Sequence, residues 1–157
     1  KTAFMSKKLI LLDLDHTLIY GSYAETETAN KLFKFNSYLS VYERPLAREL
    51  VLLCQEKGDI IIYTTALKTY AKKISRSLQI NPITILSRKD CTKKNDSFKK
   101  NIKPEWILSY DEIIVIDDSP NVWVNCPDSI KFLVPKEFRG DARDLELQSI
   151  IDEVGIL

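Results

Sequence analysis

Five short apolar runs recur along the chain, and each predicts a buried β-strand. They are rich in leucine, isoleucine and valine and do not alternate regularly with polar residues. Such runs are typical of parallel strands that are covered on both faces of a sheet. The predicted strands comprise residues 9–12, 60–63, 83–86, 113–116 and 132–134.

Apolar residues at helical spacing lie between these runs and predict four helices. The first opens at Pro45 and ends near Gly58, and the second follows Thr65. A short third helix starts at Pro104, and residues 145–154 form a closing helix. Strands that alternate with helices predict an α/β fold, three-layered and Rossmann-like, with about five parallel strands.

The segment between the first strand and Pro45 is rich in aromatic residues. Its length is sufficient for a short β-hairpin flap but not for a large cap domain. We therefore expect an open site. Open sites suit phosphate groups carried on macromolecules, because small metabolites generally need a lid that buries them and excludes water.

Length and composition predict a single domain. The chain has 157 residues, of which 45% are apolar and 29% are charged, and we place the domain at residues 5–157. Met5 resembles a natural start, so residues 1–4 are interpreted as an expression remnant. The formal net charge of +1 argues against binding by bulk electrostatic attraction but permits local charged patches.

The three cysteines are widely spaced and contain no CxxC pair, which argues against a disulfide framework or a structural zinc site. A reduced intracellular protein, cytoplasmic or nuclear, is the interpretation that this favours. No apolar stretch approaches the length needed to span a bilayer, so a membrane partner is not expected.

Polar residues follow three of the predicted strands at the point where each strand ends. Asp13 and Asp15 follow the first run. Thr64 and Thr65 follow the second, and the pair at 117–118, both aspartates, follows the fourth. Because the carboxyl ends of parallel strands meet at one edge of a sheet, we expect these side chains to lie together.

The residue types at this edge fit phosphoryl transfer. Asp13 and Asp117 offer the oxygen ligands that Mg²⁺ prefers, and a carboxylate can also attack phosphorus once cations neutralise its charge. Asp15 is positioned to protonate the leaving oxygen and then to activate water. Thr64 would donate a hydrogen bond to a phosphoryl oxygen, and a lysine from a later loop would pair with another.

The run at residues 13–17, DLDHT, resembles the DxDxT signature of the haloacid dehalogenase-like phosphatases. Thr64 then matches the second motif of that superfamily, and Asp117 with Asp118 the fourth. Residues 63–71, 114–120 and Arg44-Pro45 resemble the branch that acts on the RNA polymerase II C-terminal domain and related phosphoproteins, the NLI-interacting-factor-like branch. The resemblance extends over residues 8–154.

This resemblance implies a role for each matched carboxylate. Asp13 would be the nucleophile that forms an aspartyl-phosphate, and Asp15 the general acid and base. The Asp13 and Asp117 side chains, with the main-chain carbonyl of Asp15, would hold Mg²⁺. Asp118 would support that metal as a direct ligand or from one layer further out.

The resemblance also implies residues that hold the phosphate: Thr64 and Thr65, with one lysine. Lys100 is the preferred lysine, because residues 98–102 resemble an aromatic-x-Lys-Asp-Leu word in which Asn101 replaces the aspartate, and Lys99 is the alternative. Relatives that act on the polymerase carry an insertion after the second motif. The short distance from the second helix to Lys100 indicates that this insertion is reduced or absent.

Three functions stay open. The first is a Mg²⁺-dependent phosphomonoesterase that acts through an aspartyl-phosphate on phosphoserine or phosphothreonine in proteins. The second keeps this chemistry but acts on nucleic-acid ends or nucleotides, which the lysine-rich stretch 89–103 would contact. The third is a non-catalytic module that recognises phosphate. A dehalogenase is disfavoured, because that reaction does not require the acid at Asp15.

Four conspicuous residues receive structural interpretations. His16, the single histidine, is expected to shape the turn after Asp15. Thr17 is expected to tie down that turn through its hydroxyl. Trp106 and Trp123 are expected in the core.

Overall fold

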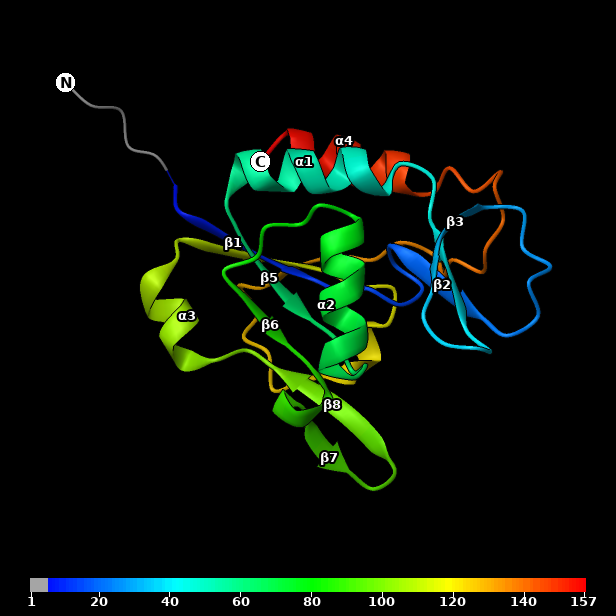
Figure 1. The fold of residues 1–157 in the computed structure, drawn as a ribbon. Helices are drawn as coiled ribbons and strands as arrows, with labels where there is room; N and C mark the ends of the chain where they lie inside the picture. The colour runs from blue at the N-terminus through cyan, green and yellow to red at the C-terminus, as the bar shows by residue number, and fades with distance from the viewer. Residues whose placement is uncertain (1–5) are drawn as a thin grey trace.

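The computed structural model describes residues 6–157, so the predicted start at Met5 and the predicted remnant at residues 1–4 lie outside the described residues. Five parallel strands form the central sheet in the order β11-β9-β1-β5-β6 (Figure 1). This confirms the α/β fold class and all five predicted strands to within one residue at either end. The strands are β1 (Lys8–Leu12), β5 (Asp59–Tyr63), β6 (Thr84–Leu86), β9 (Glu112–Ile116) and β11 (Lys131–Leu133).

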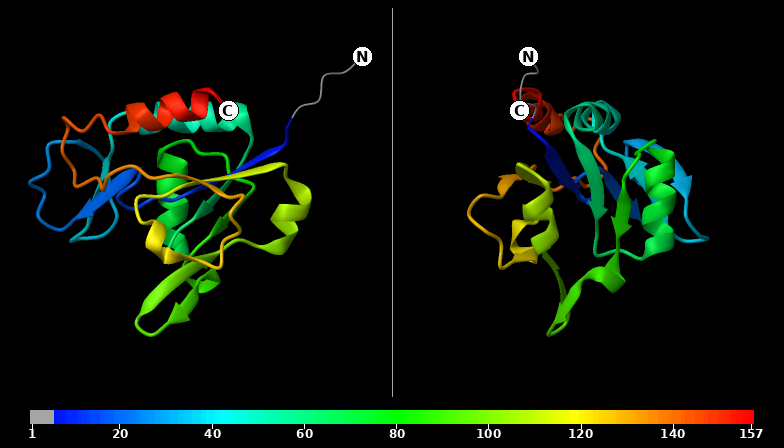
Figure 2. Two further views of the ribbon diagram at one scale, coloured as in Figure 1. Left: turned by 180° about the vertical axis from the view of Figure 1, so that it is seen from behind. Right: turned by 90° about the vertical axis from the view of Figure 1, so that its left-hand side faces the viewer.

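Alternate residues of these strands point to opposite faces of the sheet, and each face has its own helical cover. One apolar cluster combines alternate residues of β1, β5 and β9 with α1 (Ala47–Lys57), α2 (Lys68–Ser77) and α4 (Leu147–Gly155). The other face packs against α3 (Pro104–Ser109), which Figure 2 shows on the opposite side of the sheet from the other helices. The three predicted layers are therefore present.

The segment between β1 and α1 forms a small antiparallel sheet rather than a two-stranded hairpin. Its strands are β2 (Ile19–Ser22), β3 (Asn30–Lys34) and β4 (Ser40–Glu43), in the order β2-β4-β3. Only β4 is largely buried, so β2 and β3 lack the continuous apolar runs that reveal the central strands. We call this element the flap sheet. It lies beside the central sheet, at the carboxyl end of β1 (Figure 1).

A second small sheet, which the pattern did not predict, follows β6. It contains β7 (Thr92–Lys94), β8 (Ser97–Asn101) and β10 (Trp123–Val124), in the order β10-β8-β7. Strands β7 and β8 form a hairpin that projects from the sheet (Figures 1 and 2). Its lysine-rich sequence gives no alternation of apolar and polar residues, which explains why it escaped prediction. Two short 3-10 turns, Arg88–Asp90 and Pro120–Val122, flank these strands.

Among the described residues, no helix is both long enough and apolar enough to cross a membrane.

Candidate active site

The polar residues that end β1, β5 and β9 line one pocket of about 220 Å³. Strand β1 lies between β5 and β9, so the three carboxyl ends are adjacent along one edge of the sheet. The structure thus brings the residues singled out from sequence into one place. The residues that line the pocket are Asp13, Asp15, His16, Thr64, Thr65, Lys100, Asp117, Asp118, Ser119, Val122 and Glu137.

Lys100 reaches this edge from β8. Its Nζ lies 3.1 Å from Asp13 Oδ1 and 2.8 Å from Asp117 Oδ2, and the side chain is 2% exposed. Strand β8 pairs with β10 so that Lys100 stands opposite Trp123, and the ammonium lies 5.6 Å from that indole ring. Lys99 instead donates a 3.4 Å hydrogen bond to the carbonyl oxygen of Asn121. Of the two candidate lysines, only Lys100 contacts the carboxylates.

Burial and mutual repulsion dominate the electrostatics of the carboxylates. Burial, followed by the neighbouring charge of Asp13, raises the pKa of Asp117 to about 6. Burial also raises the pKa of Asp13, although Lys100 offsets part of that effect. Burial alone would lower the pKa of Lys100, but the two carboxylates outweigh it and hold that pKa above its usual value. One ammonium therefore serves several carboxylates, and the site carries a surplus of negative charge.

Hydrogen bonds fix the orientation of Asp117. The Trp123 indole donates from Nε1 to Asp117 Oδ2 at 2.9 Å, and the Ser119 amide donates to Asp117 Oδ1 at 2.9 Å. Trp123 is buried, in agreement with its predicted place in the core, but this contact was not foreseen. No rule of sequence spacing predicts this hydrogen bond, because the 3-10 turn between the two residues determines its geometry.

The Thr17 hydroxyl joins the first and fourth motifs. Its Oγ1 lies 2.9 Å from Asp13 Oδ2 and 3.0 Å from Asp118 Oδ1, and it donates to one or the other. The same oxygen accepts a 3.0 Å hydrogen bond from the Asp118 amide. Thr17 thus tethers its own turn, as the sequence suggested, and also fastens that turn to the end of β9.

Asp15 lies at the rim of the pocket and accepts a 3.2 Å hydrogen bond from the Tyr70 hydroxyl of α2. Burial raises the pKa of Asp15, and the hydrogen bond from Tyr70 opposes that shift. A raised pKa favours the protonated form that a general acid needs. Tyr70 belongs to α2, and helical spacing alone could not show that its hydroxyl reaches a carboxylate.

The two threonines after β5 occupy different positions. Thr64 is buried, and its Oγ1 accepts a 3.0 Å hydrogen bond from the Ala66 amide, which leaves its hydroxyl hydrogen available as a donor. Thr65 is half-buried at the rim, and its carbonyl oxygen accepts a 2.9 Å hydrogen bond from Arg88 Nε. Both line the pocket, so both can meet a bound phosphate.

The acidic cluster fits a hard divalent cation. Asp13, Asp117 and Asp118 each offer one carboxylate oxygen, and these atoms all lie within 4.8 Å of one another. A set of carboxylate oxygens suits Mg²⁺, which usually keeps several waters and leaves room for a substrate phosphate. The surplus negative charge beside Lys100 is the second reason that the residues fit such an ion.

Arg44 supports the turn at residues 13–17 and was not predicted as a functional residue. Its side chain is 0% exposed and pairs with Asp144 at 2.9 Å. It also donates to the carbonyl oxygens of His16 and Thr17, each at 3.1 Å, and of Lys136 at 2.7 Å. His16 has a φ of 66° and its ring contacts the Phe138 carbonyl, so it does shape the turn.

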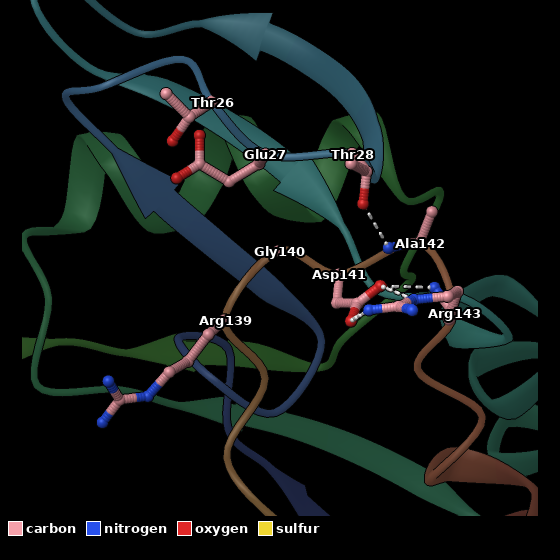
Figure 3. Close-up of a pocket in the computed structure, with 8 residues that line it drawn as sticks. All are labelled: Thr26, Glu27, Thr28, Arg139, Gly140, Asp141, Ala142 and Arg143. Atoms are coloured by element: carbon pink, nitrogen blue, oxygen red, sulfur yellow. Dashed lines mark hydrogen bonds and ion pairs between the residues drawn. The ribbon is translucent and has the colours of Figure 1, made fainter.

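A larger hollow of about 410 Å³ lies elsewhere, between the flap sheet and the segment after β11 (Figure 3). The Thr28 hydroxyl accepts a hydrogen bond from the Ala142 amide there, and Arg143 pairs with Asp141 in the same segment. Arg139 points away from that pair (Figure 3). These contacts tie the flap sheet to the C-terminal segment, and the hollow contains no cluster of carboxylates like that at the sheet edge.

Comparison with known proteins gives concordant results. The family model for NLI interacting factor-like phosphatase matches residues 8–155, which confirms the resemblance predicted from the motifs. The chain is 25% identical over 157 residues to Phosphatase Herzog of Drosophila melanogaster, covering 94% of this chain and 43% of that protein. It is 26% identical over 153 residues to an uncharacterized Schizosaccharomyces pombe protein, covering 92% and 46%.

Solved structures show the same fold. The structure of Fcp1, described as an essential RNA polymerase II CTD phosphatase, matches with a TM-score of 0.57 and 21% identity over 97% of this chain and 49% of that one. Fission yeast Fcp1-R271A bound to beryllium fluoride matches with a TM-score of 0.56, 20% identity and coverage of 97% and 50%. The chain thus spans about half the length of the relatives that it matches.

Proposed function

Because the chain belongs to the family of NLI interacting factor-like phosphatases, we propose that it hydrolyses phosphate monoesters on phosphoserine or phosphothreonine of proteins. The observation that carries the proposal is the buried Lys100 ammonium, held between the Asp13 and Asp117 carboxylates at the carboxyl edge of the sheet. A cation at this place can offset the charge of an incoming phosphoryl group beside a carboxylate nucleophile.

In the first step, an Asp13 carboxylate oxygen attacks phosphorus, and the bond between phosphorus and the ester oxygen breaks. Asp15 gives its proton to that departing oxygen, so an alcohol leaves and an aspartyl-phosphate remains. The raised pKa of Asp15 supports this assignment, because the acid must be protonated when substrate arrives. In the second step, Asp15 accepts a proton from water, which attacks phosphorus and releases Asp13 and inorganic phosphate.

Lys100, Thr64 and Thr65 would hold the phosphoryl oxygens, because all three line the pocket. The Asp13 and Asp117 side chains and the Asp15 carbonyl would hold Mg²⁺, and Asp118 would support it. When bound, that ion would neutralise charge that builds up on the phosphoryl group. Thr17 and Trp123 keep these carboxylates in place through the hydrogen bonds described above.

The shape of the site supports a macromolecular substrate. A second hollow of about 390 Å³, lined in part by Gly21 of the flap sheet, continues from Asp15 along the start of α2. Apolar and aromatic side chains line much of it, among them Leu39, Leu67 and Tyr70. An extended peptide can lie in such a groove, and the structural neighbour Fcp1 is described as a phosphatase of the RNA polymerase II CTD.

A panel of phosphoesters tests the substrate class. Phosphoserine and phosphothreonine peptides, 5′- and 3′-phosphorylated oligonucleotides and para-nitrophenyl phosphate would be compared at equal concentration, with Mg²⁺ and with a chelator. We expect metal-dependent turnover with the highest kcat/KM on peptides. Preference for oligonucleotides would refute the proposed substrate, and absence of turnover on every ester would refute the activity.

Two further expectations belong to this proposal. A location inside the cell, in cytoplasm or nucleus, is supported by three free thiols, Cys54, Cys91 and Cys126. The domain boundary at residues 5–157 is supported by a family match that covers nearly the same range.

A further inference from the structure

We propose that one face of the β7–β8 hairpin binds a second negative charge on the substrate, two or three residues from the phosphoamino acid that is hydrolysed. This inference rests on the proposed function and adds the sequence context of the substrate. The face is formed by Arg88, Lys93 and Phe98, and we call it the basic face.

The strand register determines which side chains share this face. Lys93 pairs with Phe98 across the hairpin, whereas Lys94 pairs with Ser97. Directly paired residues of antiparallel strands point to the same side, and neighbours along a strand point to opposite sides. Lys93 and Phe98 therefore lie on the same side of the hairpin as Lys100, the residue that reaches into the catalytic pocket. Lys94 lies on the other side.

Arg88 links the basic face to the catalytic pocket. Its guanidinium carbon lies 5.2 Å from the centre of the Phe98 ring, and its Nε donates to the Thr65 carbonyl oxygen at 2.9 Å. Thr65 lines the pocket itself. The guanidinium is thus held between the phosphate site and the hairpin, with its remaining donors free for a ligand.

The cations of the basic face have no acidic partner within the described part of the chain. Arg88 and Lys93 are exposed, and neither forms an ion pair there. Lysines of the flap sheet differ, because Lys31 and Lys34 both pair with Glu25. Unpaired cations beside an active site attract and orient anionic groups.

The opposite end of the pocket has the other sign of charge. Glu137, which follows β11 at the far end of the sheet from β6, lines the pocket and is exposed. Its pairing with Arg139 balances it in part. An acidic substrate segment would thus avoid that side and lie over the hairpin, which gives the substrate a direction.

The distance between Lys100 and the basic face determines how many residues separate the second charge from the phosphoamino acid. Same-face residues two apart in a strand are separated by about 7 Å, so the step from Lys100 to Phe98, with Lys93 beside it, is of that order. An extended peptide advances about 3.3 Å per residue, which places the second charge two or three residues from the first. A glutamate, an aspartate or another phosphoserine would supply it.

The experiment compares Lys93→Glu with Lys94→Glu, which makes the same charge change on the opposite side of the same hairpin. Values of kcat/KM are measured at near-physiological salt on four substrates. These are para-nitrophenyl phosphate, a phosphoserine peptide with neutral flanks, the same peptide with acidic residues two and three positions away, and a peptide with a second phosphoserine there. We expect wild type to favour the last two.

Lys93→Glu should lower kcat/KM on both anionic peptides about tenfold, whereas Lys94→Glu should change it by about twofold or less. Neither variant should alter hydrolysis of para-nitrophenyl phosphate, which also reports on folding. Equal losses of kcat/KM on the anionic peptides in both variants would overturn the inference. So would a wild type that does not prefer these peptides to the neutral one. When a 5′-phosphorylated oligonucleotide is measured in the same way, a larger effect of Lys93→Glu on it than on the anionic peptides would overturn the inference in favour of nucleic acid.

The two anionic peptides show which chemical group supplies the second negative charge. If Lys93→Glu lowers kcat/KM only on the doubly phosphorylated peptide, the basic face recognises phosphate. If it lowers kcat/KM on both anionic peptides, the face recognises anions in general. Each result supports the inference. Absence of para-nitrophenyl phosphate hydrolysis by wild type with Mg²⁺ would instead refute the proposed function, so the two failures are distinct.

Discussion

Two buried cations, Arg44 and Lys100, contact the same turn at residues 13–17 and differ in how their charge is balanced. The Arg44 guanidinium has one carboxylate partner, Asp144, and three carbonyl acceptors. The Lys100 ammonium lies between two carboxylates, Asp13 and Asp117, and the carboxylate of Asp118 lies close to both of these. Arg44 has its charge and hydrogen bonds satisfied and supports the structure, whereas Lys100 belongs to a cluster with excess negative charge, which we propose to be offset by a bound cation.

This contrast shows how a buried charge can be interpreted. Removal of either partner of a fully hydrogen-bonded buried ion pair strongly lowers stability. Such a pair has no free donor and no unbalanced charge with which to bind a ligand. A buried cluster with surplus charge lowers stability and is retained where chemistry requires it. Substitutions in the cluster around Lys100 should accordingly lower activity, whereas substitution of Arg44 should lower stability.

The largest effect is expected from Asp13→Asn. Loss of the nucleophile should lower kcat by at least about 10⁴-fold without loss of the fold, since an amide cannot form the covalent intermediate. Asp118→Asn, at a half-buried position that supports the metal site, should cost only about 10- to 100-fold. Steady-state hydrolysis of para-nitrophenyl phosphate measures both. Equal rates for Asp13→Asn and wild type would exclude Asp13 as nucleophile.

At the structural centre, Arg44→Ala should lower the free energy of unfolding by about 3–5 kcal/mol, because it leaves the Asp144 carboxylate without its cation and removes the donor that three carbonyl oxygens share. The control is Arg48→Ala, whose half-exposed pair with Glu43 contributes about 1 kcal/mol or less. Urea denaturation compares the two variants. Similar losses would show that Arg44 is not a special structural centre.

The third prediction concerns the pH dependence of the metal-free protein. The pKa of Asp117 is about 6 in the folded state against 3.8 for the free side chain, so the folded state binds more protons between these values. Stability from this group therefore falls as pH rises from about 4 to about 6, by about 3 kcal/mol in total. Urea denaturation with a chelator at pH 5.0 and pH 7.5 measures it.

Mg²⁺ should reverse this trend, since it requires ionised ligands. We expect added Mg²⁺ to stabilise the protein at pH 7.5 and to have little effect at pH 5, where Asp117 is largely protonated. Asp117→Asn is the matched control: its pH-dependent difference should shrink to the part that Asp13 and Asp15 contribute, and most of the stabilisation by Mg²⁺ should be lost. Stabilisation by Mg²⁺ that is equal at both pH values would contradict the account.

The smallest effect is expected from Trp123→Phe, which removes the hydrogen bond to Asp117 but keeps an aromatic ring beside Tyr63. Unfolding free energy should fall by about 1–2 kcal/mol, and Mg²⁺ affinity should weaken, because Asp117 loses an orienting partner. Trp106→Phe is the control, since Trp106 also packs against Tyr63 but does not contact Asp117. If both variants bind Mg²⁺ equally, the indole has no role in orientation.

The sequence predicted the central sheet and the carboxylate edge, because apolar runs and the polar residues after them are local features. Asp13, Thr64 and Asp117 could be found in this way. Lys100 could not, since no periodicity marks one lysine among many, and only a resemblance selected it. Arg44 and Tyr70 were missed for a related reason: their partners are distant in the chain, and the residues fit their own elements without them.

The two small sheets show a second limit of sequence patterns. Strands β2, β3, β7 and β8 contain polar and half-buried residues, so neither apolar runs nor regular alternation identified them. Their pairing depends on the central sheet beside them. The flap sheet was therefore expected only as a hairpin, and the basic hairpin was expected only as a lysine-rich loop.

The central claim is that Asp13 becomes phosphorylated, and a quenched-flow experiment tests it most directly. The enzyme is mixed with a ³²P-labelled phosphoserine peptide and Mg²⁺, quenched in acid within a single turnover, digested and analysed for labelled fragments. The account predicts an acid-stable, hydroxylamine-sensitive label on the fragment that contains Asp13, absent from Asp13→Asn. Turnover with no label at Asp13, or with label on another residue, would contradict it.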